Sequence, residues 1–215
     1  MASIMPVGTV SPSAGPASPE PQVAASPPAT LAPGALCTFD AGPCQVAAGH
    51  YATNRFQKPI SFDLPSPMLV GGESPGSIAL GLDDGDSLAL LDMAMTNGRQ
   101  GDSAIVVNAH ADDWLAYMRT VPLLHLGPVQ DLTVDGHAAK GVSVTRDASD
   151  DLILAYTDTI LFNWTPGETM RFVFVDAGDH DGGLIIQGDH YNGSPSEPFD
   201  ATFDALVSSI RFTGP

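Results

Sequence analysis

Short apolar runs separated by two-residue turn signals fill the chain from Tyr51 onward. The runs SIALGL and SLALLDMAM flank DDGD, and the Asp84-Gly85 pair within it is typical of a tight hairpin because both residue types tolerate a positive φ. Asp135-Gly136 repeats this arrangement inside LTVDGHAAKGVSVTRD. Because tight hairpins join antiparallel strands, the pattern predicts an antiparallel sheet.

A further strand pair and two helices complete the expected elements. We expect ILFNW at 160–164, the turn TPGE and the run TMRFVFVDAG to form a strand pair, since both runs are rich in β-branched and aromatic residues. NAHADDWLAYMRTV predicts a helix that Asp112 caps and Pro122 ends. SEPFDATFDALVSSIRF predicts a second helix whose apolar face comprises Phe199, Phe203, Leu206 and Ile210. We expect a closing strand to follow this helix.

These elements define the expected fold class. Runs of hairpins with two interposed helices favour an α+β fold over alternating β-α-β units. We therefore predict an antiparallel β-sheet built from hairpins, with two helices packed on it. A chain of 215 residues is long enough for one sizeable core, so one folded domain is expected.

The first 36 residues have a different composition from the rest of the chain. They hold eight of the 19 prolines, one charged residue and no aromatic residue. Such a stretch buries too little apolar surface to offset its ordering entropy, and proline favours extended, semi-rigid segments. We predict a disordered Pro/Ala/Ser-rich tether over 1–36, or a plain flexible terminus, followed by one α+β domain over 37–215.

Two cysteines lie at the start of the predicted domain, in CTFDAGPC. Cys37 and Cys44 with His50 would supply three zinc ligands, whereas zinc sites usually have four, and a redox pair is normally C-x-x-C. A small disulfide loop between Cys37 and Cys44 is the favoured interpretation, ahead of free buried thiols and a metal site. A disulfide would indicate export from the cytosol.

The charge of the chain limits its partners. Lys and Arg number 8 against 25 Asp and Glu, which gives a net charge of −17. Nucleic acid is excluded as a partner because its binding depends on basic side chains that neutralise phosphates. No apolar segment is long enough to span a bilayer, so no membrane insertion is expected. An unidentified protein or glycan remains as partner, and the oligomeric state stays open.

The order of the elements resembles a known group of proteins. Four segments follow one another as in uncharacterised bacterial extracytoplasmic domains, often lipoprotein-like, whose layout is similar to the PsbP/Mog1-like fold. These segments are GHYATNRFQKPISFDLP, DDWLAYMRTVPLLHLGPVQDLTVDGHAAKGVSVT, WTPGETMRFVFVDAG and FDATFDALVSSIRF. The resemblance implies this α+β fold, an extracytoplasmic or secreted setting and no established activity. It transfers no functional residue, and no export signal or anchor is visible in this chain.

An Asp- and His-rich stretch, VDAGDHDGGLIIQGDHYNG at 175–193, is the strongest candidate for a metal site. Its spacing does not match an EF-hand loop, whose twelfth position is Glu. A hairpin with a Gly- and Asp-rich tip is the favoured interpretation. The alternative is a divalent cation bound by Asp176, Asp179, His180 and Asp181.

Three hypotheses for the function follow. The first is a non-enzymatic, exported accessory or binding domain, because we find no catalytic constellation and no cofactor motif in the sequence. The second is a metal-dependent hydrolase or cation-binding protein that uses the loop 176–190. The third is a surface assembly protein whose acidic face is cross-linked by divalent cations.

Overall fold

The computed structural model describes a set of strands that are mostly antiparallel, together with two α-helices. The described residues are 30–31, 34, 36–81, 86–100, 103–147, 152–157, 159–177, 182–191 and 196–213. The predicted α+β class is confirmed.

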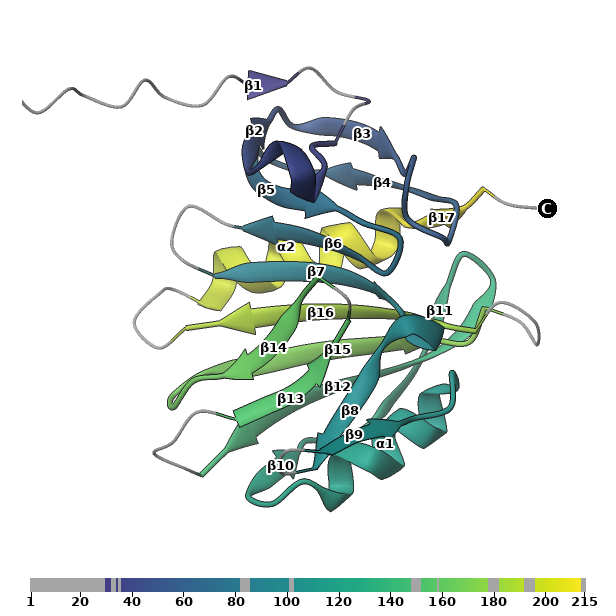
Figure 1. Cartoon of the computed structure of the whole chain (residues 1–215), viewed down its shortest axis with the longest axis vertical. Coiled ribbons are helices and arrows are strands. Elements are labelled where there is room, and N and C mark those ends of the chain that lie inside the picture. The colour runs from purple at the N-terminus through teal and green to yellow at the C-terminus, as the bar shows by residue number, and fades with distance from the viewer. Residues whose placement is uncertain are drawn as a thin grey trace, which may run out of the picture.

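A ten-stranded sheet forms the centre of the described structure (Figure 1). All its neighbours pair antiparallel except β1 with β2. Its order is β1 (Thr30–Leu31), β2 (Cys44–Val46), β5 (Met68–Glu73), β6 (Ser77–Gly81), β7 (Ser87–Asp92), β16 (Leu184–His190), β15 (Thr169–Val175), β12 (His137–Arg146) and β10 (Leu124–Leu126), with β11 (Gln130–Val134) also on β12.

Two smaller sheets complete the described strands. One has the order β14 (Leu161–Trp164), β13 (Leu152–Tyr156), β8 (Asn97–Gln100) and β9 (Ser103–Val106), and the other the order β17 (Arg211–Phe212), β4 (Ile60–Leu64) and β3 (Gly49–Ala52). The predicted pairing of 160–164 with the following run is wrong, because β14 pairs with β13 in the four-stranded sheet while β15 lies in the central one. The intervening TPGE still turns, with Gly167 at φ 91°.

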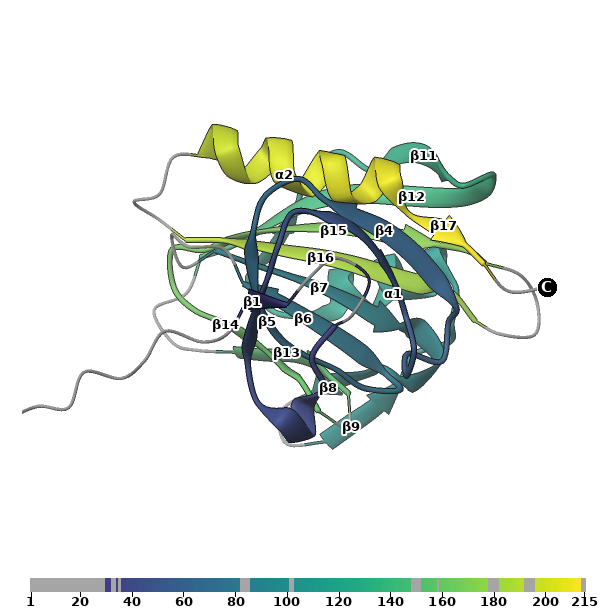
Figure 2. The same cartoon turned by 90° about the horizontal axis from the view of Figure 1, so that it is seen from above.

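The two helices lie on opposite faces of the central sheet. Figure 2 shows α2 (Ser196–Ser209) along one face, with β13, β8 and β9 on the other side. The indole of Trp114 on α1 (Ala111–Thr120) stacks on Phe174 of β15, on the face away from α2. Because both faces of β16 are covered, its residues Leu184, Ile185 and Ile186 are all buried, on alternating sides.

The hairpins predicted from Asp-Gly pairs are present in the described strands. Asp135 and Gly136 adopt φ values of 48° and 83° between the paired strands β11 and β12. Both values lie in the left-handed region, as a two-residue hairpin requires. β6 and β7 also pair antiparallel, while Asp84 and Gly85 themselves lie outside the described residues.

The helices follow their predicted patterns except at the start of α1. Phe199, Phe203, Leu206 and Ile210 are all buried, and β17 follows α2 directly. Asp112 lies within the first turn of α1, so its predicted capping role is wrong. Asp176 supplies an acceptor instead, at 2.8 Å from the amide N of Ala111. An acceptor from a distant segment cannot be read from local spacing.

The described part of the N-terminal region is held against the sheet. Thr30 and Leu31 of the predicted tether pair in parallel with β2, and Leu36 is buried in the core. Cys37 and Cys44 form the predicted disulfide, with 6.1 Å between their Cα atoms. No helix in the described part of the chain has the length and apolar character needed to cross a membrane.

Candidate ligand-binding groove

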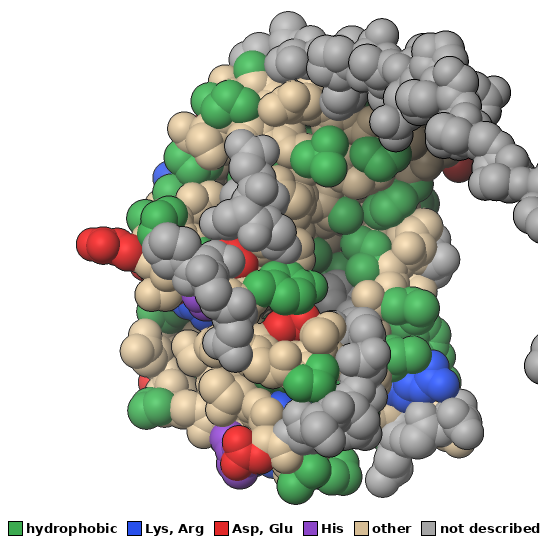
Figure 3. All heavy atoms as spheres, turned by 90° about the vertical axis from the view of Figure 1, so that its left-hand side faces the viewer, with side chains coloured by type: hydrophobic (Ala, Val, Ile, Leu, Met, Phe, Trp, Pro, Cys, Tyr) green, Lys and Arg blue, Asp and Glu red, His purple; other side chains and the backbone are tan. Residues whose placement is uncertain are grey.

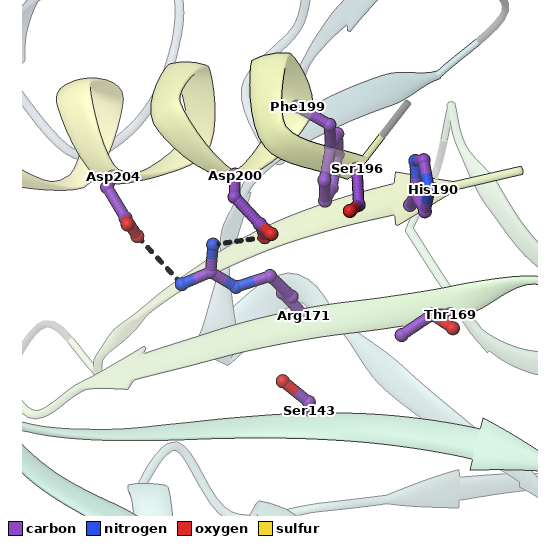
Figure 4. Close-up of a pocket in the computed structure, with 8 residues that line it drawn as sticks. All are labelled: Ser143, Thr169, Arg171, His190, Ser196, Phe199, Asp200 and Asp204. Atoms are coloured by element: carbon purple, nitrogen blue, oxygen red, sulfur yellow. Dashed lines mark hydrogen bonds and ion pairs between the residues drawn. The ribbon is translucent and has the colours of Figure 1, made fainter. Parts of the chain in front are cut away.

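A cavity of about 490 Å³ opens between α2 and the central sheet (Figure 4). Strands β12, β15 and β16 form its floor, and residues 196–204 of α2 form one wall. It is lined mostly by polar side chains, namely Ser143, Thr169, Arg171, His190, Ser196, Phe199, Asp200 and Asp204. Small-ligand sites are concave and use a few convergent polar groups to orient the ligand, and this cavity shares both features, although its lining is more polar than is usual.

Arg171 is the central side chain of this cavity. Its Nη1 lies 2.8 Å from Asp200 Oδ1 and its Nη2 lies 2.7 Å from Asp204 Oδ1. The two aspartates share one face of α2 because they are four residues apart. The guanidinium carbon also lies 4.4 Å from the centroid of the Phe203 ring. Arg171 is therefore fixed by α2 on two sides.

A second cavity, of about 320 Å³, adjoins the first along α2. Arg171 and Asp204 line both cavities. The second one is lined further by apolar side chains of β11, β15 and α2, among them Leu132, Val173 and Val207. We refer to the two cavities together as the α2 groove. Its polar and apolar halves meet at Arg171.

The polar end of the α2 groove is bounded by His190, at the end of β16. His190 Nδ1 lies 3.0 Å from Asp86 Oδ2, and the imidazole stacks on Phe199 with 5.1 Å between ring centroids. Asp86 is buried and also accepts a hydrogen bond from the amide of Tyr191 at 2.9 Å. These contacts fix the imidazole in one orientation. Figure 3 shows this end of the molecule, where acidic side chains are scattered among polar and hydrophobic ones.

On the other face of β16, behind His190, two more carboxyl groups are enclosed. Burial, together with the charges of Glu168 and Asp86, raises the pKa of Asp189 to about 7, although Ser87 and Gln187 donate hydrogen bonds to it. Glu168 is buried, with Oε2 accepting from the amide of Thr165 at 2.9 Å and Oε1 without a hydrogen-bond partner among the described residues.

The same acids shift the pKa of Tyr191. Burial first, and then the charges of Glu168, Asp189 and Asp86, raise the pKa of its phenol to about 12. The neutral form of Tyr191 is thus favoured at neutral pH, and that of Asp189 below about pH 7. We call Asp86, Glu168 and Asp189 the buried acid cluster.

The structure describes only one of the predicted metal ligands. Asp176 follows β15 and accepts a hydrogen bond from the first residue of α1, which gives it a structural role. Asp179, His180 and Asp181 lie outside the described residues. Among the residues that are described, no three His, Cys, Asp or Glu side chains gather as metal ligands would. The favoured hairpin interpretation is confirmed for its strands, since β15 and β16 pair antiparallel.

Sequence reasoning did not find the residues of the groove or the buried acid cluster. Asp200 and Asp204 carry a local signal, because they are spaced four apart beside the apolar face of a predicted helix. Arg171 interrupts the apolar run TMRFVFV, which is a second usable signal. His190 and Asp86 are 104 residues apart, and nothing local connects them.

Comparisons with known proteins gave a single kind of match. No protein-family model matches this sequence, and no curated protein matches it. Among solved structures, the chain is similar to the solution structure of cyanobacterial PsbP (CyanoP) from Synechocystis sp. PCC 6803, with a TM-score of 0.42 and 11% sequence identity. The match covers 77% of this chain and 93% of that one. The likeness concerns the fold alone and assigns no role to any residue.

Proposed function

We propose that this chain is a non-enzymatic, exported binding domain that takes its ligand in the α2 groove. The observation that carries the proposal is the cavity of about 490 Å³ with polar side chains directed toward it from α2 and from three strands (Figure 4). Rigid elements hold every lining side chain, which keeps the cost of ordering them on binding low.

The polar groups of the groove are oriented before any ligand arrives. Asp200 and Asp204 hold the guanidinium of Arg171, and buried Asp86 holds the imidazole of His190. Ser143, Thr169 and Ser196 add hydroxyl groups that both donate and accept. This arrangement supports recognition of a polar ligand of neutral or positive charge, because two carboxylates face one guanidinium.

Export and tethering are part of the same proposal. The disulfide between Cys37 and Cys44 favours an oxidising compartment outside the cytosol. The Pro-rich composition of residues 1–36 suits a spacer between a surface and the folded domain, taken as 37–215 together with the paired Thr30–Leu31 and the buried Leu36.

A chemical-shift titration tests the proposal. Uniformly labelled full-length protein would be titrated with neutral disaccharides and with short basic, neutral and acidic peptides. We expect saturable shifts of the Arg171 and His190 side chains, with those of Lys140, which lies on the opposite face, as an internal control. Turnover of substrates on a hydrolase panel that is lost in Asp86→Asn would overturn the non-enzymatic assignment, and saturable shifts confined to other surfaces would overturn the site.

A further inference from the structure

We infer that the α2 groove binds a basic, extended peptide segment, and that an arginine of this segment takes the place between Asp200 and Asp204 that Arg171 now fills. The inference rests on the proposed function, since it names the ligand class of the same groove. Arg171 would then act as an internal competitor for its own site.

Three side chains of α2 form a receptor for a guanidinium. Asp200 Oδ1 and Asp204 Oδ1 each meet one terminal nitrogen of the guanidinium, and the Phe203 ring lies against its carbon at 4.4 Å. Two carboxylates and an aromatic face bind a planar, delocalised guanidinium well. A lysine ammonium fits this arrangement less well. All three receptor residues come from α2, so the receptor does not depend on Arg171 for its position.

The carboxylates of this receptor are open to solvent. The side chains of Asp200 and Asp204 are 50% and 66% exposed, whereas Arg171 is 26% exposed. A ligand can therefore reach the carboxylates from solvent while Arg171 remains in the groove. A single ion pair at the surface is worth on the order of 1 kcal/mol, and a guanidinium shared by two carboxylates is worth more. Exchange of one guanidinium for another retains both ion pairs, so their loss does not oppose the exchange.

The groove extends to both sides of Arg171 and carries acidic groups. Cavities of about 490 and 320 Å³ lie on either side of Arg171, so a ligand that replaces it continues in both directions. Asp135 lines the second cavity as a further acidic group, and the chain as a whole carries a net charge of −17. Charge complementarity therefore selects a basic segment over an acidic one.

Competition by Arg171 leads to an unusual expectation. The apparent affinity of a ligand falls by the fraction of molecules in which its site is open. Arg171→Met removes the guanidinium and retains an apolar side chain over Phe203, so it should tighten binding, on the order of tenfold. A purely structural role for Arg171 predicts weaker binding in the same variant.

The experiment measures binding of fluorescent peptides to the full-length protein by anisotropy. The peptides share a Gly/Ser framework and carry arginine, lysine or glutamine at alternate positions, and free arginine is added as a competitor. The test variants are Arg171→Met and the double variant Asp200→Asn/Asp204→Asn. The matched control is Asp40→Asn/Asp147→Asn, which removes two exposed, ion-paired carboxylates outside the groove. Circular dichroism melts check that each variant folds.

We expect the arginine peptide to bind wild type with the highest affinity of the three peptides. Its affinity should fall at least tenfold in the Asp200/Asp204 double variant and change little in the control. It should bind Arg171→Met more tightly than wild type. Competition by free arginine as strong as that of the unlabelled peptide would overturn the extended-segment part of the inference. Equal binding of the arginine peptide to wild type and Arg171→Met, or retained binding in the Asp200/Asp204 double variant, would overturn the inference.

The two proposals fail in distinguishable ways. If the glutamine peptide or a disaccharide shifts groove resonances while the arginine peptide does not, the arginine inference is wrong and the groove remains a binding site. If no probe shifts the resonances of Arg171 or His190, both proposals are wrong.

Discussion

Substitution of Asp189 by asparagine should change how the stability of this protein depends on pH. The carboxyl group of Asp189 lies on β16 beside Glu168 and Asp86, and burial with these charges raises its pKa from 3.8 to about 7. Tyr191 faces the same acids, and Ser87 donates a hydrogen bond to the Asp189 carboxyl at 3.0 Å. The folded protein therefore binds this proton more tightly than the unfolded chain does.

The sign and size of the effect follow from linkage. Between pH 4 and pH 7 the folded state carries one more proton than the unfolded state at this site, so stability falls as pH rises through this range. The full shift corresponds to about 4 kcal/mol at most, of which about 3 kcal/mol falls between pH 5 and pH 8. Above the folded pKa, the ionised carboxyl of Asp189 lowers the free energy of unfolding by up to about 4 kcal/mol relative to its protonated form.

The assay is urea unfolding of wild type and Asp189→Asn at pH 5 and pH 8. The amide is neutral at both values, so the variant should gain stability relative to wild type at pH 8 and change little at pH 5. Glu197→Gln, at an exposed position in the first turn of α2, removes one charge as a control and should show no such difference. If Asp189→Asn and wild type lose the same stability between pH 5 and pH 8, the reasoning about Asp189 is refuted.

Two further predictions concern packing and helix initiation. A Cβ on Gly188 would lie 2.7 Å from the Phe203 ring, so Gly188→Ala should destabilise the fold by about 1–3 kcal/mol in thermal unfolding, whereas Gly81→Ala, with its nearest contact at 3.6 Å, should have a smaller effect. Asp176→Ala removes the acceptor at the start of α1 and should cost about 1 kcal/mol, measured by urea unfolding. A larger loss in Asp112→Ala than in Asp176→Ala would contradict this assignment.

Local signals in the sequence predicted the turns and the helix faces. Asp135-Gly136 adopts the positive φ values that its residue types allow, and the buried positions of α2 follow the helical period. These features depend on neighbours within a few positions along the chain. The partner of 160–164 was predicted wrongly because strand pairing is decided by the whole sheet, and here β14 pairs with β13 in a different sheet from β15.

The sites depend on register between strands, which the sequence does not express locally. The stretch 175–193 stands out for its density of Asp and His, yet Asp176, the one predicted metal ligand that the structure describes, serves a helix start. Among the described residues of that stretch, Asp189 has the largest pKa shift, and the metal hypothesis did not name it as a ligand. The pKa of Asp189 is shifted by burial and by charged neighbours from other segments of the chain, and neither can be predicted from the residues next to it in the sequence.

Register explains why the buried acid cluster forms where it does. Asp189 on β16 pairs with Ser87 on β7, which places Asp86 beside the end of β16, and His190 pairs with Thr169 on β15, which brings Glu168 to the same end. Three adjacent antiparallel strands thus deliver one carboxylate each to one end of the sheet. The same register turns His190 toward α2 and Asp189 away from it, because neighbouring residues of a strand face opposite sides. A proton on Asp189 and a ligand beside His190 therefore act on one strand end, and shift titrations at pH 5 and pH 8 would measure their coupling directly.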